Sequence, residues 1–362
     1  MTIILYGSKT SFYTGKVRAY LDWKKIEYEE VLATAEIHRD IIVPIVGRSV
    51  IPIVKTEAGD ILQDSSCIID YFESKNGGPS VFPEGPRQLM VALLLELFGD
   101  EWLTIPAMHY RWHYNEHWAY REFGATASPD ANPEEQYELG KKRGELFKGF
   151  CSILGINELT IPAIEKSYEA LLAELDAHFS AYDYLLGSRP SIGDYGLIGA
   201  FYAHLYRDPA SGKIMNRLAP CVVRWVERML DAKAAPPGSF LPDDEVPATL
   251  VPILERLMAE LMPWLQETAE IFETWASENP DAEIPRLVGI ANYTIEGVSG
   301  QRAASPFSLW MLQRPQAHYE QLDQLQRKSV DQMLDRIGGI DAYRYFRAGP
   351  KLIFEDYKIK LA

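Results

Sequence analysis

Short apolar runs alternate with helically spaced apolar positions over the first 75 residues. The runs predict strands, and a Gly-Asp turn between the last two predicts a hairpin. The predicted strands are residues 3–6, 28–32, 50–54 and 61–63, and the predicted helices are residues 16–25 and 65–74. The order is β-α-β, a connection, and β-β-α.

Beyond a linker at residues 76–80, helical periodicity dominates the chain. The predicted helices are residues 88–103, 108–119, 164–184, 194–206, 220–232, 248–277 and 307–337, with loops at 127–133 and 234–247. Pro315 is expected to kink the last helix. The polar, glycine-containing stretch 292–302 is expected to be a loop, so the last third of the chain contributes helices.

The composition is that of an ordinary globular protein with a net charge of −15. This charge disfavours nucleic acid and anionic membrane surfaces as partners. Cys67, Cys151 and Cys221 are few and widely spaced, which indicates a reducing compartment. No secretory signal precedes the first strand, and the apolar run 91–95 is too short to span a bilayer. The expected location is therefore the cytoplasm.

Ser11 follows the first predicted strand and opens the first predicted helix. A thioredoxin-type fold places its Cys-x-x-Cys motif at this point, where a helix N-terminus stabilises an anion such as a thiolate. The Ser11 hydroxyl is suited to donate to a bound thiolate, because no base that would make it a nucleophile is evident. Ser11 as a simple N-cap is an equal alternative.

Two further signals follow in the same segment. Proline at a strand start suggests a special turn, and a cis Ile51-Pro52 bond would expose the backbone of Ile51 to a ligand; a trans bond is the commoner alternative. Asp64 and Ser65 begin a helix, where Ser65 could hold a carboxylate and Asp64 an ammonium. Ordinary capping is the alternative for this pair.

In order and spacing, these motifs resemble the glutathione S-transferase superfamily over residues 1–230. The stretch 189–194 adds a helix-capping motif similar to the family's. In this motif Ser191 caps a helix, and the Asp194 side chain reaches back to the N–H of the cap residue. The resemblance implies an α/β thioredoxin-like domain at residues 1–78, an all-α domain at 86–232, and a helical extension at 233–362 packed on the second domain. It implies glutathione as co-substrate, bound by Ile51, Pro52, Asp64 and Ser65, with Ser11 as the catalytic residue.

Several features depart from the family pattern. Tyr6 is a rival to Ser11, because some members activate the thiol with a tyrosine near the end of the first strand. His38 and Arg39 loosely match a basic position that meets the glycyl carboxylate, and the role of Arg48 stays open. Most members end near residue 232, whereas this chain continues for 130 residues.

Residues 109–118 interleave histidine with aromatic side chains. Within this stretch His109, Tyr110, Trp112 and His113 are candidates for a second-substrate pocket, as the resemblance places this helix beside the transferase cleft. A metal site is disfavoured because nothing completes the ligand set. Core packing remains an equal alternative.

The expected function is attack by activated glutathione on a hydrophobic or aromatic electrophile, as in detoxifying transferases or related lyases, isomerases and reductases. A non-catalytic glutathione-binding or protein-interaction module is the alternative, with the extension as its interaction surface. The resemblance implies a homodimer. No metal, nucleic acid or membrane partner is expected, and the second substrate stays undefined.

Overall fold

The computed structural model describes residues 2–231, 233, 236–344 and 349–362. Its contacts divide the chain into two compact units. Unit 1 comprises residues 1–80, 106–151 and 195–237, and unit 2 comprises residues 81–105, 152–194 and 238–362. Each unit joins segments that are distant in sequence. The expected boundary at residue 232 lies outside the described residues.

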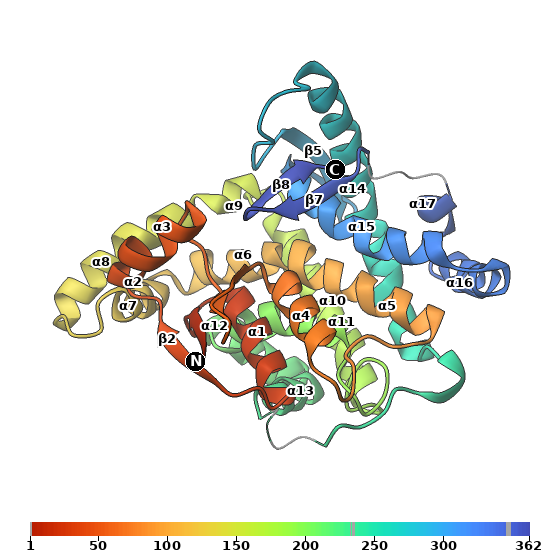
Figure 1. The fold of residues 1–362 in the computed structure, drawn as a ribbon, viewed down its shortest axis with the longest axis horizontal. Helices are drawn as coiled ribbons and strands as arrows, with labels where there is room; N and C mark the ends of the chain where they lie inside the picture. Colours follow the sequence, from red (N-terminus) through yellow and green to blue (C-terminus); the bar gives the residue numbers. More distant parts are fainter. Residues whose placement is uncertain (1, 232, 234–235, 345–348) are drawn as a thin grey trace. The chain divides into compact units, whose positions relative to one another are not determined.

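Unit 1 contains a four-stranded sheet in the order β2-β1-β3-β4, which has the thioredoxin-like topology expected from the sequence (Figure 1). β1 pairs parallel with β2, and the remaining pairs are antiparallel. The bounds are β1 (Ile3–Gly7), β2 (Tyr28–Leu32), β3 (Ile53–Lys55) and β4 (Ile61–Gln63). Leu5 and Val54 are fully buried, so the central strands supply part of the core.

The helices that lie wholly or partly in unit 1 begin with α1, whose apolar face includes Phe12, Tyr20 and Trp23. They are α1 (Phe12–Trp23), α2 (Ala35–Ile37), η1 (His38–Ile42), α3 (Val43–Val46), α4 (Ser65–Lys75), α6 (Thr104–Tyr114), α7 (Glu116–Ala127), α8 (Pro133–Lys148), α9 (Phe150–Ile153), α11 (Ile192–Ala200), η3 (Phe201–Tyr206), α12 (Pro209–Leu218) and α13 (Pro220–Leu230). α7 and α8 pack side by side, with Gly124 and Gly140 where the two backbones approach closely.

Unit 2 is built around the long helix α14. Its elements are α5 (Pro86–Leu97), η2 (Phe98–Trp102), α10 (Ile161–Phe179), η5 (Pro242–Asp244), η6 (Ala248–Leu250), α14 (Val251–Glu278), β5 (Gly289–Ile295), β6 (Val298–Ala304), α15 (Pro306–Gln321), α16 (Gln324–Arg336), α17 (Ile340–Arg344), β7 (Leu352–Glu355) and β8 (Lys358–Leu361). α14 contacts α10, α15 and β5, and both α15 and α16 contact α5. The apolar stripe of α14 is therefore covered within this unit.

A buried polar cluster in unit 2 joins these elements. Glu260 of α14 accepts hydrogen bonds from the Trp102 indole at 3.0 Å and from Ser167 of α10 at 3.0 Å, and it pairs with Arg256. Arg302 of β6 lies 4.0 Å from the centre of the Trp264 ring and donates to the carbonyl of Glu101. Because these charges are hydrogen-bonded as well as buried, they fix how the segments pack.

The structure corrects several sequence expectations. The predicted loop at 292–302 is wrong, since β5 and β6 form a hairpin whose turn residues Glu296 and Gly297 have φ +47 and +78. Tyr293 and Ile295 alternate with exposed neighbours in β5, and the polar residues around them obscured this pattern. The helix predicted at 307–337 is two helices, α15 and α16. α8 was not predicted, because few apolar residues mark its sequence.

The predicted capping motif before α11 is confirmed in part. The backbone N–H of Ser191 donates to Oδ2 of Asp194 at 2.8 Å, as expected for a side chain that reaches back. The Ser191 hydroxyl donates to the same oxygen at 2.9 Å. Asp194 also accepts from the N–H of Leu185, so this buried carboxylate organises the start of the helix.

Candidate functional site

Strand register brings three predicted motifs to one end of the sheet in unit 1. β1 ends at Gly7, so Ser11 follows that end of the strand. β3 begins at Ile53 opposite Tyr6, and Ile51-Pro52 directly precedes it. β4 ends at Gln63 opposite Ile53, and Asp64 and Ser65 directly follow. We call this end of the sheet, with the starts of α1 and α4, the candidate site.

Ser11 is the N-cap of α1, and its Oγ accepts a hydrogen bond from the N–H of Thr14 at 3.2 Å. Ser11 therefore does cap the helix, but this cap uses its hydroxyl only as a hydrogen-bond acceptor. Its proton remains available for donation, and the helix N-terminus favours a nearby anion. The rival Tyr6 is 7% exposed within β1.

The Ile51-Pro52 peptide bond is cis, so the structure excludes the alternative of a trans bond. Pro52 is buried and Ile51 is partly exposed. The proline occupies the residue before β3, where its missing N–H removes no hydrogen bond from the described strand pairs.

Asp64 caps α4 and has an unusual backbone conformation. Its Oδ1 accepts from the N–H groups of Ser66 at 2.9 Å and Cys67 at 3.0 Å. Its φ of +78 is disfavoured for a residue with a side chain, and such strain is concentrated at functional sites. Ser65 is 2% exposed, and its hydroxyl makes no hydrogen bond with the described residues. The first N–H and the hydroxyl of α4 are thus available to an anion.

Lys16 is a residue that the sequence interpretation missed. It is fully buried, and its Nζ donates to Oγ of Ser66 at 2.9 Å, which joins α1 to the first turn of α4. This buried ammonium stands beside the N-terminus of α4, which carries the positive end of the helix dipole. A signal was present, because Lys16 falls four residues after Phe12 on the apolar face of the helix.

Two arginines hold the loop between β1 and Ser11. Arg111 of α6 donates from Nη1 to the Thr10 carbonyl at 3.0 Å and pairs with Asp208 through two bonds of 2.8 Å. Arg207 donates to the Lys9 carbonyl at 2.9 Å. Burial raises the pKa of Asp208, and Arg111 opposes that shift. The loop that carries Ser11 is therefore anchored to the helical part of unit 1.

His38 and Arg143 meet near the approach to Pro52. Nη2 of Arg143 lies 2.8 Å from Nε2 of His38, whose Nδ1 lies 2.9 Å from Oγ of Ser49. A guanidinium has no acceptor, so Nε2 accepts and Nδ1–H donates to Ser49. Burial, with Arg143, lowers the pKa of His38 to about 4. Arg48 donates to Gln63 at 3.2 Å, beside the capping residue Asp64.

Arg39, the other basic candidate in this segment, is paired locally. Its Nε donates to Oδ1 of Asp40 at 2.6 Å, and its side chain is 69% exposed. The neighbouring histidine, His38, is instead 6% exposed. The structure therefore gives the two candidates different surroundings.

The aromatic segment of α6 separates into two groups. The rings of His109, Tyr110 and His113 cluster, with centroids 5.0 Å apart for His109–Tyr110 and 4.9 Å for His109–His113. Trp112 packs instead against Tyr120 and Phe123. Because of this division, Trp112 does not share a face with the other three candidates.

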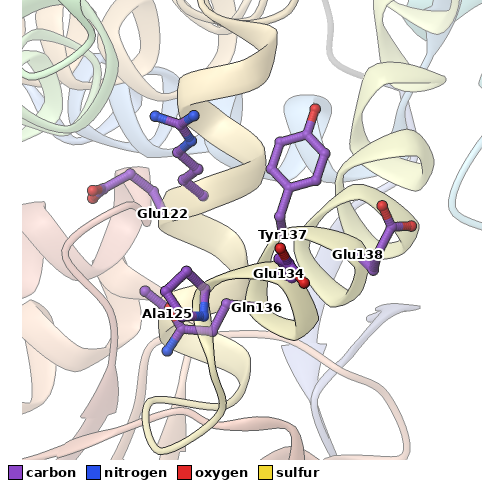
Figure 2. A pocket seen from close by; sticks show the side chains of 8 residues that line it. Glu122, Ala125, Glu134, Gln136, Tyr137 and Glu138 are labelled. Atoms are coloured by element: carbon purple, nitrogen blue, oxygen red, sulfur yellow. The ribbon is translucent and has the colours of Figure 1, made fainter.

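A hollow of ≈ 860 Å³ lies between α7 and α8 (Figure 2). Figure 2 shows Glu122 and Ala125 on one helix of the pair and Glu134, Tyr137 and Glu138 on the other. The lining residues are Arg121, Glu122, Ala125, Pro133, Glu134, Gln136, Tyr137 and Glu138. It includes none of the predicted site residues, and its glutamates disfavour an anionic ligand.

The described residues contain neither a metal-binding cluster nor a helix that could span a membrane. Within the described ranges, no group of three or more His, Cys, Asp and Glu residues is arranged to hold a metal ion. Across the same part of the chain, no helix combines the length and apolarity needed to cross a membrane.

Two families match the segments that carry these motifs. Glutathione S-transferase, N-terminal domain, matches residues 5–80, and Glutathione S-transferase, C-terminal domain, matches residues 160–232. The first match contains Ser11, Pro52 and Ser65. The chain belongs to the glutathione S-transferase superfamily.

Solved structures with similar folds come from bacteria and plants. The beta-etherase LigF of Sphingobium sp. strain SYK-6 is 20% identical, with 64% of this chain and 97% of that chain covered and a TM-score of 0.48. The tau class glutathione S-transferase MiGSTU of mango, Mangifera indica L., is 18% identical, covering 68% and 94% with a TM-score of 0.42. A GST-like protein of Pseudomonas syringae is 19% identical, covering 67% and 77% with a TM-score of 0.43. No curated protein matches the sequence.

Proposed function

We propose that this protein binds glutathione at the candidate site and activates its thiol for attack on a hydrophobic or aromatic electrophile. The supporting observation is that Ser11, Ile51-Pro52 and Ser65 meet at one end of the sheet, where two helices begin. The γ-glutamyl carboxylate would bind the N–H and hydroxyl of Ser65, and its ammonium would meet Asp64. The cysteinyl backbone would pair with Ile51.

Thiolate stabilisation falls to Ser11 in this proposal. The Ser11 hydroxyl donates a hydrogen bond to the thiolate, which lies at the N-terminus of α1, and both interactions lower the thiol pKa from its usual value of about 8.5. The sulfur then forms a C–S bond to the electrophilic carbon as the bond from that carbon to its leaving group breaks, and the thiol proton passes to solvent. The proposal also includes a homodimer, as the family resemblance implies; light scattering at micromolar concentration would measure it.

The test is the Ser11→Ala substitution, with Ser11→Thr as the conservative rescue and Ser74→Ala as an exposed control on α4. A charged hydrogen bond contributes about 1.5–3 kcal/mol, so Ser11→Ala should lower kcat by roughly tenfold to a hundredfold. The glutathione Kd should change little, because the hydroxyl meets sulfur. Ultraviolet titration of glutathione bound to Ser11→Ala should show a thiol pKa higher than that of glutathione bound to the wild-type protein.

Other outcomes assign the role elsewhere. A comparable loss in Tyr6→Phe, with Ser11→Ala unaffected, would move thiol activation to Tyr6. Glutathione binding without turnover of any electrophile would favour the non-catalytic binding module. Failure of glutathione to bind the wild-type protein would reject the proposed function itself.

A further inference from the structure

The guanidinium of Arg143 on α8 is paired with no carboxylate of the described residues. Among the described residues it makes no ion pair, and its one hydrogen bond runs to Nε2 of His38, an uncharged acceptor. Burial lowers the pKa of Arg143, and burial and Arg143 together lower that of His38; no acidic group counters either shift. The chain has a net charge of −15, so a half-buried arginine without a carboxylate partner among the described residues is unusual.

Apolar side chains flank this cation on the same face of α8. Leu139 and Phe147 lie four residues before and after Arg143, the spacing that brings side chains together on a helix. Leu139 is 44% exposed and Phe147 is 37% exposed. Phe150 of α9, 40% exposed, continues the row, with its ring centroid 6.1 Å from that of Phe147. The face thus combines a positive group with exposed aromatic surface.

A chain of hydrogen bonds links this face to the candidate site. Arg143 bonds to His38, and His38 bonds to Ser49, two residues before Ile51. The proposed binding position of the glutathione cysteinyl group is therefore close in the structure to the guanidinium. A ligand on the α8 face would lie within reach of the thiol.

We propose that Arg143 and the exposed aromatic side chains of α8 and α9 bind the carboxylate and the ring of an aromatic acid, which is the second substrate. The guanidinium supplies two parallel donors that match a carboxylate, and the phenylalanine rings cover the apolar part. This inference rests on the proposed glutathione-dependent function. A carboxylate could also come from the glycine end of glutathione, so the experiment separates the two sources.

The test uses a matched pair of electrophiles, 4-chloro-3-nitrobenzoate and the neutral 4-chloro-3-nitrobenzamide. In both, glutathione sulfur bonds to the ring carbon, chloride leaves, and the thiol proton goes to solvent. Arg143→Gln removes the cation, Arg143→Lys keeps it, and Lys142→Gln makes the same charge change at an exposed neighbour. All variants are made in the full-length chain, and urea unfolding checks that they fold.

Arg143→Gln should raise KM for the benzoate by about tenfold, the size expected for one partly solvated charged contact. KM for the benzamide and for glutathione should stay within about twofold, and Lys142→Gln should match wild type. Arg143→Lys should recover part of the loss. Calorimetric binding of 3-nitrobenzoate and 3-nitrobenzamide gives the same comparison without turnover, so it stands even if thiol chemistry fails.

Two results would overturn the proposal. If Arg143→Gln weakened glutathione but left γ-glutamylcysteine, which lacks the glycine carboxylate, unaffected, the guanidinium would belong to the glycine end. If the variant changed the benzoate and the benzamide equally, Arg143 would serve only to hold His38. Ser65→Ala tests the proposed glutathione site separately. If this variant lost glutathione binding but still preferred 3-nitrobenzoate over 3-nitrobenzamide, the site of the aromatic acid would be independent of the glutathione site.

Discussion

Arg111 on α6 and Arg143 on α8 are both withdrawn from solvent in unit 1, but they meet different partners. Arg111 is 1% exposed and pairs through two bonds with Asp208, which is fully buried. Arg143 is half-buried and meets only the neutral ring of His38 among the described residues. Every guanidinium nitrogen of Arg111 donates to the protein and Asp208 balances its charge, whereas Arg143 has one bond, to a neutral ring. A saturated cation supports structure, whereas an unsaturated one is open to a ligand.

The largest expected effect is the loss of Arg111. Arg111→Met leaves the Asp208 carboxylate buried without its cation and removes the anchors of the Thr10 and Ala203 carbonyls. Breaking such a pair from one side should lower the free energy of unfolding by about 3–5 kcal/mol. Urea denaturation measures this, and Arg143→Met should cost much less.

The double variant Arg111→Met with Asp208→Leu provides the control. Replacing both partners by apolar side chains removes the unpaired charge, so part of the lost stability should return. If the double variant were no more stable than Arg111→Met, the ion pair would not be the cause. A loss in Arg143→Met as large as in Arg111→Met would remove the distinction between the two arginines.

The second prediction uses acid to charge His38 against Arg143. The pKa of His38 falls from 6.5 in the unfolded chain to about 4 in the fold, so the folded state favours the neutral ring. This contribution to stability is complete above pH 6.5 and decreases as the pH falls toward 4. Between pH 7 and 5, His38→Gln should reduce the acid-induced loss of unfolding free energy by about 2 kcal/mol.

Other buried histidines also lower the stability of the fold when they are protonated in this pH range. The unfolding free energy of His38→Gln should therefore still fall with decreasing pH, but less steeply than that of the wild-type protein. Burial also lowers the pKa of His178 to about 4, and that of His204 lies well below its ordinary value. Urea midpoints across this range, with His113→Gln as an exposed control, measure the difference. An unchanged profile in His38→Gln would show that protonation of this ring does not oppose folding.

The sequence predicted the parts of the candidate site that depend on local order. Ser11, Pro52 and Ser65 each stand directly beside a strand or helix end, so the element order alone brings them together. Lys16, Arg111 and Arg143 could not be assigned in this way. Their partners lie 50, 97 and 105 residues away, so only the folded chain shows which charges are satisfied.

The errors in the fold have a similar cause. The hairpin of β5 and β6 has polar residues over much of its length, and its buried positions, such as Tyr293, are set by packing against distant segments. The Tyr293 hydroxyl donates to the carbonyl of Gly155 at 2.8 Å, across 138 residues. Tertiary contacts of this kind override weak local patterns.

The smallest expected effect concerns Arg207, which holds the same loop as Arg111 from a more exposed position. It donates to the Lys9 carbonyl and pairs with Glu122 at 2.6 Å, where the two side chains are 19% and 34% exposed. Solvent screens such a pair, so Arg207→Gln should lower the unfolding free energy by less than about 1 kcal/mol.

Amide exchange of residues 8–11 should nevertheless quicken in Arg207→Gln, because one of the two anchors of the loop is lost. Hydrogen-exchange mass spectrometry of this segment, compared with the exposed control Arg121→Gln, measures that release. Unchanged exchange in Arg207→Gln would mean that the buried pair of Arg111 and Asp208 is sufficient to hold the Ser11 loop.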